Sequence, residues 1–256
     1  MTRGSKLIAY YAIINDGDWH KIRDSIMEKK HPSEEDVDSV VSKIKCNYIT
    51  LLDSEYPEPL KKIYKPPLIL FYYGDISLIR DEKRNISIVG SRKPEKSIIE
   101  PTKAIIKEIS KKLNVVSGLS YGIDAIAHET CLSAGGKTIA VLGNGIEFIY
   151  LDENKELYEH IKKDGLIISE YPGYTEPNKD NFPFRNRIIA SLSKGMFIPD
   201  IKVASGTYSS MSNALVMGKD VFVLPHLPMS QTINNTLIKE GAIIVDTAED
   251  ILDEYA

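Results

Sequence analysis

The stretch NVVSGLSYGIDAIAHETCLSAGGKTIAVLGNG, residues 114–145, decides the fold class. Two apolar runs, NVVSG (114–118) and TIAVLG (138–143), have the length and composition of buried strands, and the segment between them is helical in pattern. A strand, a crossover helix and a second strand predict a right-handed βαβ unit with parallel strands. Because these strands are apolar almost throughout, we expect a sheet covered on both faces.

The same alternation continues on both sides of this stretch. Further strands are expected at ISIVG (86–90), LIISE (166–170), MFIPD (196–200), DVFVLP (220–225) and AIIVD (242–246). Helices are expected over 98–113, 123–134, 154–163, 186–193, 210–217 and 233–240. The pattern predicts an α/β fold, doubly wound, with a mostly parallel Rossmann-like sheet.

The chain before residue 76 has a different pattern. Residues 6–45 show the apolar spacing of short helices, and Ser33 is placed to cap a helix with acids in its first turn. Prolines interrupt the connector over 47–75, where 68–73 is a candidate strand. We therefore expect a small N-terminal helical domain with its connector at 1–75 and a Rossmann-like domain at 76–256.

Composition predicts an ordinary soluble protein of a reducing compartment. The 256 residues are 43% hydrophobic with a net charge of −4, which argues against a polybasic arm that coats nucleic acid. Cys46 and Cys131 lie far apart and show no metal-ligand or redox spacing. The apolar runs are too short to span a bilayer. We expect a cytoplasmic protein without a cofactor.

Glycine-rich loops follow several of the expected strands, at the sheet edge where doubly wound proteins bind their ligands. Glycine permits close backbone approach, and N–H groups at the start of the next helix attract anions. We predict a phosphate-binding rim there; tight strand-to-helix turns are the alternative role of each glycine. The rim residues are Gly90, Ser91, Gly118, Gly122, Asp124, Gly143, Gly145, Ser205, Gly206 and Thr207.

The loop EYPGYTEPNKDNFPFRNRII, residues 170–189, interleaves basic and aromatic side chains. This mixture suits single-stranded nucleic acid, because cations meet phosphates while rings stack on bases. Lys179, Phe182, Arg185 and Arg187 are the candidates for such contacts. An ordinary surface loop, with its phenylalanines folded onto the core, is the alternative interpretation.

Catalytic groups show no pattern in this sequence. Asp124 suits the first turn of a helix, and a structural role is the simpler interpretation of His128. A Ser–His–Asp order, paired carboxylates within one loop and His/Cys metal spacing are all missing from the sequence. We therefore predict neither a catalytic residue nor a metal site.

Taken together, several motifs resemble the DNA-processing protein A (DprA, Smf) family. They are IVGSR (88–92), VSGLSYGIDAIAH (116–128), GGKTIAVLGNGIEFIY (135–150), FPFRNRIIASLS (182–193), the looser SGTYSSMSNAL (205–215) and LIKEGAIIVDTAEDIL (237–252). They occur in the family's order over nearly the whole chain. The resemblance implies a protein that binds single-stranded DNA, protects it and helps load the RecA recombinase, as in natural transformation.

The resemblance also implies roles for individual residues. By motif, Arg92, Lys179, Phe182, Arg185 and Arg187 would contact DNA.

A homodimer is implied as well, formed through the late part of the Rossmann-like domain. Leu237, Ile238 and Ile244 are its candidate residues by position, with a place in the core as the alternative.

Two other functions remain open. One is a nucleotide-binding module that senses a small phosphorylated ligand. The other is a nucleotide N-glycosidase similar to the "lonely guy" proteins, because Ser205-Gly206-Thr207 faintly resembles the Gly-Thr loop of those enzymes.

Overall fold

The computed structural model describes residues 2–28, 32–202, 206–228 and 230–256, and within these ranges the strands form one nine-stranded sheet. Its order is β1-β2-β6-β5-β4-β3-β7-β8-β9. The strands are β1 (Asn47–Thr50), β2 (Ile69–Gly74), β3 (Asn85–Ile88), β4 (Asn114–Ser117), β5 (Thr138–Leu142), β6 (Leu166–Ser169), β7 (Gly195–Ile198), β8 (Asp220–Val223) and β9 (Ile243–Ile244).

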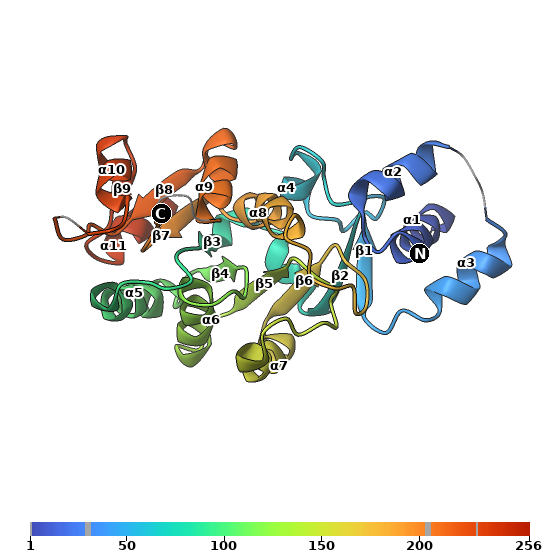
Figure 1. The fold of residues 1–256 in the computed structure, drawn as a ribbon, viewed down its shortest axis with the longest axis horizontal. Helices are drawn as coiled ribbons and strands as arrows, with labels where there is room; N and C mark the ends of the chain where they lie inside the picture. Colours follow the sequence, from blue (N-terminus) through green and yellow to red (C-terminus); the bar gives the residue numbers. More distant parts are fainter. Residues whose placement is uncertain (1, 29–31, 203–205, 229) are drawn as a thin grey trace.

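Helices cover both faces of this sheet. The α-helices are α1 (Arg3–Ile14), α2 (Trp19–Met27), α3 (Glu34–Val41), α4 (Glu58–Lys61), α5 (Lys96–Ile109), α6 (Ile123–Ser133), α7 (Lys155–Asp164), α8 (Asn181–Ser191), α9 (Thr207–Val216), α10 (Asn234–Lys239) and α11 (Glu249–Leu252). Figure 1 shows α8, α9 and α10 on one side of the strands and α5, α6 and α7 on the other. The predicted doubly wound α/β fold is confirmed.

Strands β3 to β9 pair in parallel, and the chain fills the sheet in two directions from β3. From β3 it proceeds through β4 and β5 to β6; it then returns to β7 on the other side of β3 and ends at β9. The strand order therefore reverses between β3 and β7. In open α/β sheets a ligand crevice forms beyond the carboxyl ends of the strands at such a point.

The connector belongs to the sheet. Strand β2 pairs antiparallel with β6, with Phe71 opposite Ser169, and β1 pairs antiparallel with β2. The expected boundary after residue 75 follows β2 directly, so strands on both sides of it belong to one sheet. Strand β1 was not expected from the sequence.

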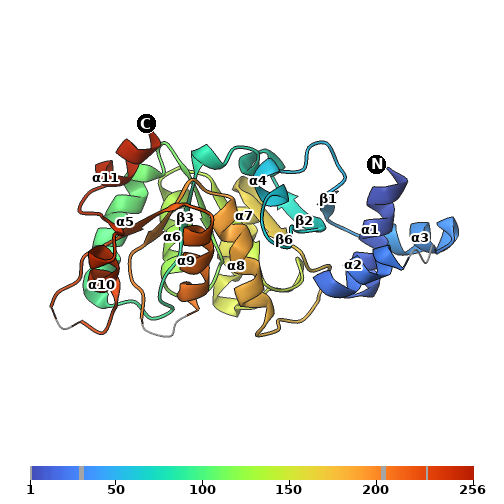
Figure 2. The same ribbon diagram turned by 90° about the horizontal axis from the view of Figure 1, so that it is seen from above.

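Helix α1 packs against this end of the sheet, and α2 and α3 contact α1 (Figure 2). Ile8 and Tyr11 of α1 share a buried cluster with Phe71 of β2. The predicted cap is confirmed, because the Ser33 hydroxyl accepts a hydrogen bond of 3.1 Å from the Asp36 N–H.

Two of the three candidate dimer residues lie inward. Leu237 is buried in the core on the α8–α9 face, and Ile238 packs partly buried against the same core. Both are explained by the fold of one protomer, which corrects the expectation for Leu237. Ile244, on edge strand β9, has 46% of its surface exposed.

Candidate nucleic-acid interface

A cavity of about 590 Å³ opens beyond the carboxyl ends of β3 and β7, where the strand order reverses. Its walls come from the loop after β3 (89–92), the start of α6, the loop before α8 and the first turn of α9. We call it the switch-point cavity. It gathers residues from five of the six quoted motifs, which lie far apart in the sequence.

Backbone hydrogen bonds fix the floor of this cavity. The Ser91 N–H donates to the Asp200 carbonyl at 2.8 Å, and the Ile123 N–H donates to the Ser91 carbonyl at 3.1 Å. Gly122 has a φ of +74°, and a Cβ there would lie 2.3 Å from the Ser91 oxygen, so only glycine fits. The Ser91 N–H is therefore engaged within the fold, while the residue lines the cavity and its part in phosphate binding stays a prediction.

Arg185 lines the cavity as a buried residue. Its Nη1 donates to the carbonyl oxygens of Gly118 and Val141, and the side chain is buried. A Cβ on Gly118 would lie 2.6 Å from the guanidinium, so this glycine makes room for the arginine. Burial lowers the pKa of Arg185 to about 10, which leaves it cationic at neutral pH. The fold thus holds Nη1 of this guanidinium, and a direct phosphate contact by Arg185 stays a prediction.

Arg187 does not line the switch-point cavity. Its Nη1 and Nη2 donate to the two carboxylate oxygens of Glu170, each at 2.7 Å, and both residues are buried. A guanidinium engaged in this way has no free face for a phosphate. The expected DNA contact at Arg187 is therefore replaced by a structural role.

The cavity wall is positively charged although the chain is not. Arg92 and Lys179 are exposed, and Lys202 is half-buried with its Nζ donating to the Lys93 carbonyl at 2.9 Å. Among the lining residues that the structure describes, Asp124 alone carries a carboxylate, and burial raises its pKa. A local cationic patch in a chain of net charge −4 focuses anions at this point.

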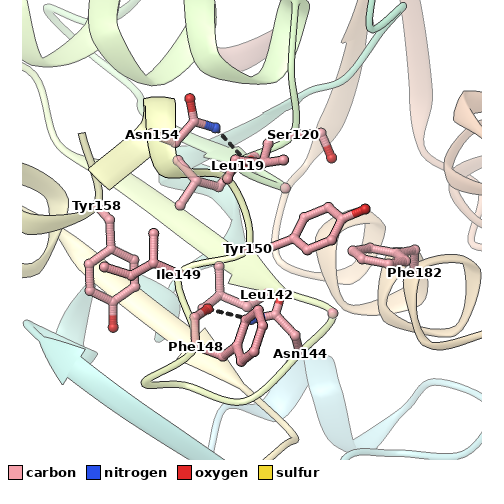
Figure 3. A pocket seen from close by; sticks show the side chains of 13 residues that line it. Leu119, Ser120, Leu142, Asn144, Phe148, Ile149, Tyr150, Asn154, Tyr158 and Phe182 are labelled. Atoms are coloured by element: carbon pink, nitrogen blue, oxygen red, sulfur yellow. Dashed lines mark hydrogen bonds between the residues drawn. The ribbon is translucent and has the colours of Figure 1, made fainter. Parts of the chain in front are cut away.

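Two aromatic rings meet at the cavity. The centroids of Tyr150 and Phe182 lie 5.3 Å apart, with the ring planes tilted by 47° (Figure 3). Tyr150 is 46% exposed, so part of its ring faces solvent. A Cβ on Gly143 would lie 2.8 Å from the Phe182 ring, so this glycine admits the phenylalanine. Rings at a cationic groove provide surfaces on which bases stack.

The comparisons with known proteins agree with this geometry. A model of the family described as DNA recombination-mediator protein A matches residues 47–256. The chain belongs to this family. DNA processing protein DprA of Streptococcus pneumoniae is 38% identical over 208 residues, covering 80% of this chain and 73% of that protein. DprA of Bacillus subtilis is 38% identical over 211 residues, covering 81% and 71%.

Solved structures of DprA proteins share the fold. The Streptococcus pneumoniae structure has a TM-score of 0.82 at 33% identity and covers 98% of this chain and 94% of its own. A Helicobacter pylori structure, which concerns that protein's single-stranded DNA binding mode, has a TM-score of 0.74 at 30% identity. It covers 82% of this chain and 96% of its own.

In this member of the DprA family, the remaining predicted rim residues divide into two groups. Gly206 and Thr207 line the switch-point cavity at the start of α9, and the Thr207 hydroxyl donates to the Gly90 carbonyl at 3.1 Å. Ser205 lies outside the described residues. Gly145 instead packs against the loop at 173–175, where its N–H donates to the Thr175 carbonyl at 2.8 Å. Its expected place on the rim is therefore corrected.

The sequence patterns did not identify Tyr150 or Lys202 as residues of the site. Tyr150 ends the GGKTIAVLGNGIEFIY motif in an irregular loop, so neither helical nor strand periodicity marks it. Lys202 follows β7 as a single cation without a motif of its own.

The described part of the DprA-family chain offers no cluster of three or more His, Cys, Asp or Glu side chains that could hold a metal ion. None of its described helices combines the length and apolar character needed to cross a bilayer.

Proposed function

We propose that this chain binds single-stranded DNA in the switch-point cavity and acts as a recombination mediator that protects the strand and helps load RecA onto it. The proposal rests on one observation: cationic and aromatic side chains line the same cavity at the topological switch point. A relative at 30% identity, from Helicobacter pylori, binds single-stranded DNA, which supports the same ligand class here.

The contacts are assigned by chemistry. Phosphates pair with Arg92 and Lys179, which are exposed, and with Lys202. The starts of α8 and α9 border the same cavity, and N–H groups at helix N-termini attract phosphates. Buried Arg185, which lines the cavity, adds electrostatic attraction for the phosphates. Backbone contacts of this kind give affinity that is independent of sequence and falls with salt.

Discrimination against duplex DNA comes from the rings. A base that stacks on Phe182 or Tyr150 contributes about 1–3 kcal/mol. Bases within a duplex are already stacked and paired, so they are not free to use these rings. Single strands are therefore preferred.

A homodimer would strengthen binding to long strands, because the second site then engages at high effective concentration. We propose Ile244, exposed on edge strand β9, as part of that interface. The cytoplasm is the proposed place of action, because recombination of DNA takes place there.

A binding role without catalysis is the proposal for the cavity. The alternative N-glycosidase would need a carboxylate that reaches the ligand. Asp124 is the candidate in the described lining, but it is buried, with its Oδ2 accepting from the Ser120 N–H at 3.3 Å. Release of free base from a nucleoside monophosphate would support the enzyme instead.

The test is fluorescence anisotropy with labelled oligo-dT, duplex DNA and mononucleotides at two salt concentrations. Salt-sensitive binding that prefers single strands is the expected result. Arg92→Ala and Lys179→Ala should both weaken it, while Lys107→Ala on distant helix α5 should not. A folded parent protein that binds no oligonucleotide would overturn the proposal.

A further inference from the structure

A second cluster of aromatic and cationic side chains lies at the junction of α2, the connector and α8. The Lys65 Nζ lies 5.2 Å from the ring centroid of Tyr64 and 5.8 Å from those of Trp19 and Phe184. We call these four residues the Lys65 cluster. It brings together three segments that are separate in the sequence.

The backbone of this cluster is held in place. Lys65 has a φ of +53°, a conformation that non-glycine residues adopt only when the surroundings impose it. Arg187 Nε donates to the Lys65 carbonyl at 3.0 Å, and Trp19 Nε1 donates to the Pro66 carbonyl at 2.8 Å. The cluster is thus preorganised by the buried pair between Arg187 and Glu170.

The cluster is open and positive. Tyr64 is 82% exposed, and His20, whose Nε2 lies 3.1 Å from the Lys65 Nζ, is exposed as well. No described carboxylate forms an ion pair with Lys65. Arg23 also stacks on Trp19 but is paired with Asp24, so its charge is already balanced. An exposed ring beside an unbalanced cation suits a base and its phosphate.

The Lys65 cluster lies on the other side of the first turn of α8 from the switch-point cavity. Phe182 lines the cavity and Phe184 belongs to the cluster; both lie in the first turn of α8. Two residues along a helix of 3.6 residues per turn point in nearly opposite directions, roughly 200° apart. Exposed Pro183 lies between them. A strand that leaves the cavity over this turn therefore arrives at the cluster.

We propose that Tyr64 and Lys65 form a second contact for the same single strand, outside the switch-point cavity. This inference rests on the proposed function, because it assigns the path of the strand beyond the first site. Single-stranded DNA is favoured over an acidic peptide because the cluster offers a stacking surface as well as a charge, and because it adjoins a site of the same chemistry.

The test compares short and long oligonucleotides, labelled dT6 and dT30, on the full chain. Tyr64→Ala and Lys65→Gln should leave the affinity for dT6 unchanged and lower that for dT30 by at least about fivefold, the scale of one lost stacking contact. Tyr64→Phe keeps the ring and should bind dT30 like the parent. Lys107→Gln controls for the loss of a charge elsewhere.

The outcomes separate this inference from the proposed function. Parent-like dT30 affinity in both Tyr64→Ala and Lys65→Gln, with dT6 binding intact, would overturn the second contact alone. Failure of the parent to bind either oligonucleotide would overturn both. Weaker binding of dT6 in the same variants would also contradict the inference, since it would mean that the cluster acts on the cavity itself.

Discussion

Arg187 and Glu170 form a doubly hydrogen-bonded ion pair in the interior, with both N–O distances at 2.7 Å. The same arginine donates to the carbonyl oxygens of Lys65 and Phe184. One side chain thus ties the residue after β6, the connector and α8 together. The arrangement supports the switch-point cavity without contributing a lining residue to it.

Replacing Arg187 should therefore affect stability before it affects binding. Arg187→Ala leaves a buried carboxylate without its partner, which costs about 3–5 kcal/mol of the free energy of unfolding. Urea denaturation of parent and variant measures this loss. The exposed pair of Arg80 with Glu55 is the matched control, and Arg80→Ala should cost at most about 1 kcal/mol. A parent-like midpoint for Arg187→Ala would contradict the structural role.

Replacing Arg92 or Lys179 should instead weaken DNA binding and leave the stability of the fold almost unchanged. Both side chains are exposed, so their replacement by alanine should change the free energy of unfolding by less than about 0.5 kcal/mol. Each lost phosphate contact should lower the slope of log affinity against log salt by about 0.7 for a single strand. Titrations of oligo-dT at four salt concentrations measure that slope. An unchanged slope in both variants would remove these residues from the DNA contact.

Phe182 and Tyr150 should contribute by stacking. Phe182→Ala is expected to weaken oligo-dT binding by about 1–3 kcal/mol, and Phe182→Leu should lose most of the same energy because a leucine has no π-face. Tyr150→Phe keeps its ring and should bind like the parent, whereas Tyr150→Ala should not. Equal affinity across all four variants would show that bases do not reach these rings.

Much of the fold could be predicted from the sequence because buried parallel strands leave long apolar runs. The expected strand at 86–90 appears as Asn85–Ile88, and that at 138–143 appears as Thr138–Leu142. Strand β1 escaped notice because NYIT is four residues long and stands in a connector rich in proline. Its place in the sheet depends on pairing with β2, which no local pattern records.

The site was predicted less completely, since sequence alone does not separate a surface arginine from a buried one. Arg185 and Arg187 stand two apart in a loop-like motif, yet both are enclosed by carbonyl or carboxylate oxygens supplied from distant segments. The Gly118 carbonyl is 67 residues from Arg185 in the chain. Arg92 and Lys179 stay candidates because the structure leaves them exposed on the cavity wall.

Because of His128, the free energy of unfolding should decrease as the pH falls below 6.5. Its Nδ1 lies 2.6 Å from the Thr138 hydroxyl, which itself donates to the Val115 carbonyl at 3.0 Å, so the imidazole is the donor at Nδ1. Its Nε2 is buried and without a hydrogen-bond partner among the described residues. Burial lowers the pKa of His128 from 6.5 to about 3, which keeps the folded ring neutral.

The direction of the pH effect follows from proton binding. Between pH 6.5 and about 3 the unfolded chain takes up a proton on His128 and the folded chain does not, so stability falls as the pH falls through this range. The contribution is complete above pH 6.5, and its slope reaches at most about 1.4 kcal/mol per pH unit. Asp124 acts in the opposite direction, because burial raises its pKa and the folded state holds that proton longer.

Urea denaturation of parent and His128→Gln at pH 7, 6, 5 and 4 tests this prediction. The variant should be less stable than the parent at pH 7, because it disturbs a fully buried site, but its stability should fall less steeply towards pH 4. Asp124→Asn serves as the control of opposite sign and should steepen the fall. If stability fell equally with pH in the parent and in His128→Gln, His128 would bind its proton equally in the folded and unfolded states. That result would contradict the prediction, which rests on the burial of His128 and its unpartnered Nε2.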